Sequence, residues 1–147
     1  MSLEEQIQKE LTEAMKLKDE LRLSVLRMVK SALKLKSVEK MRPLEDAESL
    51  QVLQTLVKQR RESVEQFTKG GRMDLANKET KEIAIIESFL PTQLSDSEID
   101  AAVDAAIAEI KADSLKQMGQ VMAVLRDRFA GSLDMGKAGA RVKAKLS

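Results

Sequence analysis

The sequence predicts an all-α protein with an N-terminal four-helix unit and a small C-terminal three-helix domain. Apolar residues recur at helical spacing along the 147 residues, and no stretch shows the alternation typical of a strand. Hydrophobic residues make up 43% and charged residues 33%, a composition rich enough in apolar residues for a packed core. A proline stop followed by a helix-start signal, in ESFLPTQLSDSEID (87–100), divides the chain.

The first two helices are each predicted from an apolar face. SLEE at Ser2 has the spacing of a capping box, and one apolar stripe follows it, formed by Leu3, Ile7, Leu11 and Met15. The second helix is predicted in LRLSVLRMVKSALKLK, whose apolar face contains Leu21, Val25, Met28, Val29, Ala32 and Leu33. Both faces need a partner to cover them.

Two further helices complete the predicted N-terminal unit. Pro43 suits the entry to a helix, and Gly70 with Gly71 should terminate that helix. Its apolar positions are Leu50, Leu53, Val57, Val64 and Phe67. A fourth helix is predicted from about Met73, with Leu75, Ile83, Ile86 and Phe89 on one side. Together the four helices fit a helical bundle.

The break after the fourth helix predicts the domain boundary. Pro91 lacks the backbone N–H that a helix interior needs, so the fourth helix should end before it. Ser95 and Glu98 then have capping-box spacing, and Leu94 with Ile99 has the spacing of a hydrophobic staple. The predicted domains are residues 1–92 and 93–147.

Charge divides the C-terminal domain, which should hold three short helices. Residues 91–114 contain one base and six acids, whereas residues 115–147 contain seven bases and two acids. Lys137, Arg141 and Lys145 recur at four-residue spacing, opposite an apolar stripe of Met135, Ala138, Val142 and Leu146. Such a basic stripe can track phosphates. The alternative is a solvated face, placed where cations favour a helix C-terminus.

Missing residue types exclude most catalytic chemistry. The chain has no Cys, His, Trp or Tyr, so thiolate or imidazole metal sites, Cys or Ser–His nucleophiles and disulfides are excluded. TKGGRM lacks the spacing of a phosphate-binding loop. We therefore expect no catalytic residue, cofactor or metal. With no apolar run near the length of a membrane span and no secretory signal, we expect a soluble cytoplasmic protein without membrane partners.

Two arginines interrupt the apolar faces of the N-terminal unit. Arg22 and Arg61 should extend to solvent or pair with a carboxylate such as Glu65 or Glu87. The functional alternative is a secondary nucleic-acid patch that gathers Arg27, Lys30, Lys34, Lys58, Arg60 and Arg61. The only aromatic residues are Phe67, Phe89 and Phe129, all expected to face the core. RNA would therefore be recognised by shape and backbone.

Four segments in order resemble one family. LRLSVLRMVKSA, VKQRRESVEQFTKGGRMDLANKE, EIAIIESFLPTQLSDSEI and KQMGQVMAVL look like a stand-alone member of the GatB/YqeY family, and the resemblance covers essentially the whole chain. The C-terminal third is similar to the tail domain of the B subunit of the amidotransferase that amidates misacylated Glu-tRNA or Asp-tRNA. In that enzyme the tail grips tRNA, and other parts perform the chemistry.

The resemblance implies a tRNA-related role and suggests where RNA would bind. Gly119 in the MGQVM stretch would permit either a close backbone approach or tight helix packing. In the tail-domain pattern, a Gly–base–Ala–Asp turn precedes the last helix. Gly131 and Asp134 match this turn, but Ser132 and Leu133 stand where the pattern has a base and an alanine. The RNA-binding candidates are Lys116, Gly119, Arg126, Arg128, Lys137, Arg141, Lys143 and Lys145.

Three functions remain open at this point. The first is a binding module for tRNA or other structured RNA. It would assist tRNA-dependent amidation, with a protein of aminoacyl-tRNA metabolism as its partner. The second is a helical adaptor that binds a protein through the acidic 96–113 face or the third helix. The third is an amidotransferase that takes nitrogen from glutamine, which the family name suggests. The residue inventory offers no nucleophile or ATP loop for this third function.

Overall fold

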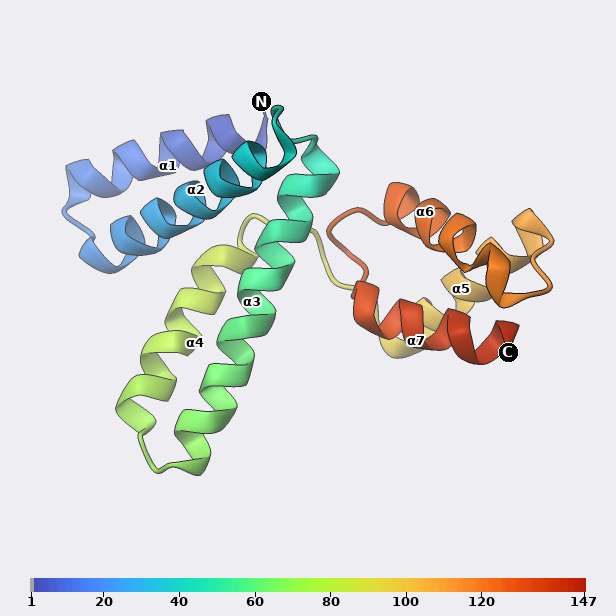
Figure 1. Cartoon of the computed structure of the whole chain (residues 1–147). Coiled ribbons are helices and arrows are strands. Elements are labelled where there is room, and N and C mark those ends of the chain that lie inside the picture. The colour runs from blue at the N-terminus through green and yellow to red at the C-terminus, as the bar shows by residue number, and fades with distance from the viewer. Residues whose placement is uncertain (1) are drawn as a thin grey trace. The chain divides into compact units, whose positions relative to one another are not determined.

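The computed structural model describes residues 2–147 and confirms the all-α prediction. Within this range it contains seven α-helices, one short 3₁₀ helix and no strand (Figure 1). The elements are α1 (Leu3–Leu17), α2 (Glu20–Lys40), α3 (Asp46–Lys69), α4 (Met73–Glu87), α5 (Asp96–Ile110), η1 (Leu115–Gln117), α6 (Met118–Arg128) and α7 (Met135–Leu146). The chain divides into two compact units, unit 1 (Met1–Leu90) and unit 2 (Pro91–Ser147).

The first hairpin of unit 1 begins at a capped helix. The Ser2 hydroxyl accepts a hydrogen bond from the Glu5 N–H at 3.2 Å, which satisfies one free donor of the first turn of α1. Ile7 and Leu11 are buried as predicted. Met15 is 53% exposed, so its placement in the core is wrong. Ala14, nearer the centre of the same stripe, is buried instead, and α1 ends just beyond it.

Unit 1 consists of two helical hairpins rather than one four-helix bundle. α1 packs chiefly on α2 and α3 chiefly on α4, and α2 joins the hairpins by contacting both α3 and α4 (Figure 1). The shared core is a cluster of Ile7, Leu11, Ala14, Val25, Leu26, Val29, Leu33, Leu53, Val57, Ile83, Ile86 and Phe89. Phe67 lies outside this cluster and is only partly buried, so its predicted core position is wrong. It lies in the last turn of α3, which ends in a glycine turn with Gly71 at φ +74°.

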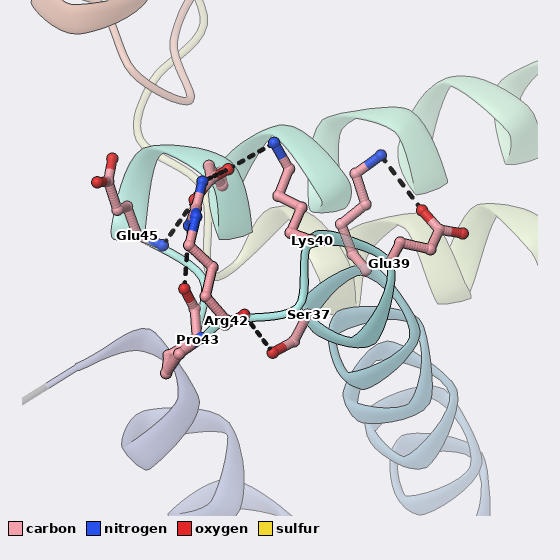
Figure 2. Close-up of polar contacts among 8 residues, drawn as sticks. Ser37, Glu39, Lys40, Arg42, Pro43 and Glu45 are labelled. Carbon is pink, nitrogen blue, oxygen red and sulfur yellow. Dashed lines mark hydrogen bonds and ion pairs between the residues drawn. The ribbon is translucent and has the colours of Figure 1, made fainter.

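The Glu48 carboxylate stabilises the loop between α2 and α3, which connects the two hairpins. Glu48 accepts two hydrogen bonds from Arg42, at 2.7 and 2.9 Å, and a third from the Glu45 N–H at 3.0 Å. Lys40 lies 2.7 Å from the same carboxylate. Figure 2 shows Lys40 and Arg42 extending from the end of α2 to the start of α3. These contacts hold the pKa of Glu48 far below its usual value, the Arg42 hydrogen bond contributing most.

Unit 2 has its own apolar core. Its buried residues are Ile99, Ala102, Val103, Ala106, Val121, Leu125, Leu133, Ala138, Val142 and Leu146. The predicted apolar stripe of α7 is therefore confirmed. The predicted capping box is also confirmed, because Ser95 accepts from the Glu98 N–H at 3.2 Å and Glu98 accepts from the Ser95 N–H at 2.9 Å.

The segment before α5 is bonded to the turn between α6 and α7. The Leu94 N–H donates to the Ser132 carbonyl at 2.9 Å, and the Gln93 side-chain amide donates to the Gly131 carbonyl at 2.5 Å. Leu94 also packs against the cluster that contains Ile99, as a hydrophobic staple requires. The chain from Gln93 onward is thus held within unit 2.

Candidate nucleic-acid interface

The predicted basic stripe of α7 faces an acidic stripe on α5. The Lys137 ammonium lies 3.1 Å from Asp96 and the Arg141 Nε lies 2.7 Å from Asp100. Lys145 pairs with Asp104. Both stripes repeat every four residues, and the pairs follow one another in the same order along the two helices. We call these six residues the α5–α7 ladder.

Arg141 is the central residue of this ladder. Besides Asp100, its guanidinium lies 3.5 Å from Asp96, so it bridges two carboxylates. Its side chain is 25% exposed, less than that of Lys137 or Lys145. One of its nitrogens, Nη1, is buried without a hydrogen-bond partner among residues 2–147. Arg141 therefore has a remaining donor.

The ladder changes the acidity of one carboxyl group. The pKa of Asp96 lies below its usual value, mainly because Lys137 donates a hydrogen bond to it and adds an attractive charge. Arg141 contributes in the same direction. The opposite charges of the two halves of unit 2 thus meet on the surface of the unit, where they neutralise one another.

Arg128 is also paired with α5. Its guanidinium donates to Glu109 at 2.6 Å. Four of the eight predicted RNA-binding residues, Arg128, Lys137, Arg141 and Lys145, therefore contact acids on α5. The sequence pattern showed the two charge blocks but did not indicate that they would face each other.

The other four candidates lie on a different face. Within residues 2–147, the exposed bases Lys116, Arg126 and Lys143 have no ion-pair partner. The fourth candidate is Gly119, which is also exposed. We call these four residues the α6–α7 face.

Helix geometry relates two cations of this face to the contact between α6 and α7. A Cβ added at Gly139 on α7 would lie 3.8 Å from the ends of both Met118 and Met122 on α6. Arg126 continues the row of Met118 and Met122 at four-residue spacing, and Lys143 follows Gly139 at the same spacing. Because α6 and α7 run antiparallel (Figure 1), Arg126 and Lys143 lie in opposite directions from this contact, each one turn beyond it on its own helix.

Gly119 is not required for packing within the protein. A Cβ added there would have no atom within 4 Å. The interpretation of this glycine as a tight helix-packing residue is therefore wrong. Its backbone is open to solvent in the first turn of α6, next to the Lys116 turn.

In the turn before α7, the two residues that match the tail-domain pattern, Gly131 and Asp134, have clear structural roles. Gly131 has φ +78°, a conformation that favours glycine. The Asp134 carboxylate caps α7 by accepting from the Lys137 N–H at 3.0 Å. Leu133 is buried in the core. Leu133, which stands where the tail-domain pattern has an alanine, therefore packs into the apolar core of unit 2.

The secondary basic patch on unit 1 is largely engaged in structural contacts. Arg60 lies between two acids of α4, 3.2 Å from Glu82 and 3.9 Å from Glu79. Arg61 donates to Glu87 at 2.9 Å, which confirms the predicted pairing. Arg22 pairs with Glu10 rather than with either predicted acid.

The rest of the secondary patch is spread over two helices. Lys30 donates to the Gln8 side chain at 2.6 Å. Arg27 and Lys34 on α2 and Lys58 on α3 are exposed, and none of the three has an ion-pair partner within residues 2–147. These three cations therefore remain available in this patch.

The described part of the chain offers neither a metal cluster nor a membrane span. Within residues 2–147, no group of three or more acidic side chains is placed to hold a metal ion. None of the helices in that range combines the length and apolarity needed to cross a membrane.

The fold and this site define a class of small all-α proteins with two helical units and a surface of unpaired cations. The chain belongs to the family of Yqey-like proteins, whose pattern matches residues 4–146. Among similar proteins is the Lachancea thermotolerans "Altered inheritance of mitochondria protein 41, mitochondrial", 36% identical over 109 residues, or 71% of this chain. Its Kluyveromyces lactis namesake is 35% identical over 109 residues, also 71% of this chain.

The chain spans 58% of the length of each of these two relatives. The relatives also correct one prediction. The expectation of a cytoplasmic location is contradicted, because these similar proteins are named as mitochondrial. That expectation came from the lack of membrane and secretory segments, and such a lack does not distinguish one aqueous compartment from another.

Proposed function

We propose that unit 2 is a binding module for tRNA or another structured RNA, and that the α6–α7 face contacts the phosphate backbone. The observation that carries this proposal is that Lys116, Arg126 and Lys143 are exposed without an ion-pair partner within residues 2–147, on elements that also carry the exposed Gly119 or pack against them. Unpaired cations release counterions when they bind phosphates, which is the main source of affinity for a nucleic-acid backbone. The face contains no exposed aromatic side chain for base stacking, so recognition depends on RNA shape.

Gly119 strengthens this assignment. A glycine in the middle of a helix costs about 0.5 to 1 kcal/mol relative to alanine, which is an upper bound for Gly119 in the first turn of α6. Because no neighbouring atom needs the space, packing does not account for that cost. A sugar–phosphate backbone that approaches α6 closely would account for it.

The resemblance that the sequence suggests between the C-terminal third and a tRNA-gripping tail domain is a further reason for the proposal. In this interpretation the chain binds RNA and performs no amidation itself, and it serves as an accessory to an enzyme of aminoacyl-tRNA metabolism. The α6–α7 face then takes the place of the α7 stripe as the principal contact, since the three cations of that stripe, Lys137, Arg141 and Lys145, are already paired.

A titration of fluorescently labelled tRNA tests this function. The change is the triple variant K116Q/R126Q/K143Q, and the control is K9Q/K78Q/K81Q, which removes three exposed lysines of unit 1. We expect the first variant to bind more weakly, with the slope of log affinity against log salt reduced by about 0.7 to 0.9 for each phosphate that the variant no longer neutralises. Equal reductions in both variants would indicate diffuse attraction without a site.

One observation favours a second candidate, a protein adaptor. Leu35, Val38 and Met41 at the end of α2 are 63%, 64% and 91% exposed. Apolar side chains at this spacing suit docking of another helix. Such binding would change little with salt, whereas phosphate binding weakens steeply. A partner captured equally at low and high salt, together with no tRNA affinity, would favour the adaptor.

A further inference from the structure

The α5–α7 ladder leaves three cations of α7 occupied by three carboxylates. We propose that this basic stripe is a second phosphate-binding surface, kept latent because the acids of α5 occupy it in the way an RNA backbone would. This inference rests on the proposed RNA-binding function and adds its regulation. The α6–α7 face is the open surface, and the α7 stripe is the masked one.

The ladder has the charge pattern of such a competitor. Asp96, Asp100 and Asp104 recur at four-residue spacing, so their carboxylates form a row with about 6 Å of helix between neighbours. Each carboxylate contacts one or two cations of α7. A single strand of phosphates is similarly a row of singly charged acceptors.

The pairs are weak enough to be exchanged. The side chains of Asp96, Asp100 and Asp104 are 68%, 52% and 65% exposed. Exposed ion pairs contribute little, and they weaken further as salt rises. A polyanion that releases counterions can therefore displace them. The Arg141 side chain is less exposed, at 25%, but its buried Nη1 has no hydrogen-bond partner among residues 2–147, so the acids do not fully satisfy its guanidinium.

Exchange of partners does not require unit 2 to unfold. The contact between α5 and α7 is held by apolar side chains such as Val103 and Val142, which are fully buried. The caps of both helices also do not use the charged groups of the ladder, because Ser95 caps α5 and Asp134 caps α7 through the backbone N–H of Lys137. The acids can therefore be neutralised while the fold remains.

The test is a gain of binding. The variant D96N/D100N/D104N keeps side-chain size and removes the three negative charges. We expect it to bind labelled tRNA about 3- to 100-fold more tightly than the parent, since three weak ion pairs no longer compete with the phosphates for the α7 cations. The salt slope should steepen by up to about 0.7 to 0.9 for each α7 cation released. Retention on a heparin column should rise as well.

Two controls separate unmasking from a change in net charge. E13Q/E62Q/D113N removes three exposed acids outside the ladder, none with an ion-pair partner within residues 2–147, and should change affinity much less. Adding K137Q/R141Q/K145Q to the Asn variant should abolish the gain. Circular dichroism of every variant establishes that unit 2 is folded.

The outcomes distinguish the open α6–α7 face from the latent α7 stripe. A folded Asn variant that binds no better than the parent, or no better than E13Q/E62Q/D113N, would overturn the latent surface while leaving the α6–α7 face intact. A parent that does not bind tRNA, with an Asn variant that does, would reject the open α6–α7 site and support the masked one. No binding by either protein would reject both claims.

Discussion

The Nε of Arg141 on α7 lies 2.7 Å from the carboxylate of Asp100 on α5. This contact is the centre of a ladder in which the acidic half of unit 2 neutralises much of its basic half. The structure therefore separates two groups of cations that look alike in the sequence. One group pairs with α5, and the other flanks the contact between α6 and α7.

Replacing Arg141 should destabilise unit 2. R141Q removes the contacts to Asp96 and Asp100, and we expect the free energy of unfolding at low salt to fall by about 0.5 to 1 kcal/mol. K143Q is the matched control on the same helix, and it should have no measurable effect because Lys143 has no acidic partner within residues 2–147. Urea unfolding at low and at high salt measures both variants. An R141Q effect that is unchanged at high salt would mean that packing, not charge, is responsible.

Gly119→Ala should separate stability from function. The added methyl group meets no neighbouring atom, so the protein should be equally stable or more stable by up to about 1 kcal/mol. Affinity for tRNA should nevertheless fall, because the methyl group would hold the RNA backbone away from α6. Gly139→Ala is the control, since Gly139 faces Met118 and Met122 within the protein. Thermal unfolding and a tRNA titration of the two variants are sufficient; unchanged affinity in G119A would remove Gly119 from the interface.

The pH dependence of the ladder follows from Asp96. Its pKa is lower in the folded protein than its ordinary value, through the Lys137 hydrogen bond. A carboxyl group of this kind stabilises the fold above its unfolded pKa of about 3.9, and this contribution disappears as the pH falls through the lower folded value. We expect carbon NMR to show a depressed Asp96 pKa that rises in K137Q. An equal Asp96 pKa in both proteins would contradict the pairing in solution.

The two units should fold separately. Each has its own buried cluster, and Gln93 and Leu94 are bonded within unit 2. A fragment of residues 1–92 and a fragment of residues 93–147 are both expected to be helical by circular dichroism and to unfold cooperatively. Limited proteolysis of the whole chain should first cleave between Leu90 and Leu94. An unfolded 1–92 fragment would show that unit 1 depends on the rest of the chain.

Local signals in the sequence predicted the helices well. Pro91, the Ser95–Glu98 box and the Gly70–Gly71 pair act through the backbone of their own neighbourhood, so their effect can be recognised without a structure. Periodicity also predicted the buried stripe of α7. It failed for Met15 and Phe67, because burial near a helix end depends on how far the neighbouring helix extends.

The site was harder to predict, because pairing across helices depends on tertiary packing. The four-residue spacing separates Lys137, Arg141 and Lys145 from Lys143 in the sequence, but it does not by itself show that α5 lies beside these three. One signal could have been used: the acids at 96, 100 and 104 have the same spacing as the bases at 137, 141 and 145. The open environment of Gly119 could not have been recognised from spacing alone.

The RNA-binding proposal is tested most directly by comparing K116Q/R126Q/K143Q with K137Q/R141Q/K145Q in one tRNA titration over a series of salt concentrations. We predict that the first variant binds more weakly and has a flatter salt slope, since its three cations are available to phosphates in the parent protein. The second variant should be affected less, because its cations are held by α5 in the parent. A larger fall in affinity for the second variant, with both proteins folded, would contradict the assignment of the RNA contact to the α6–α7 face.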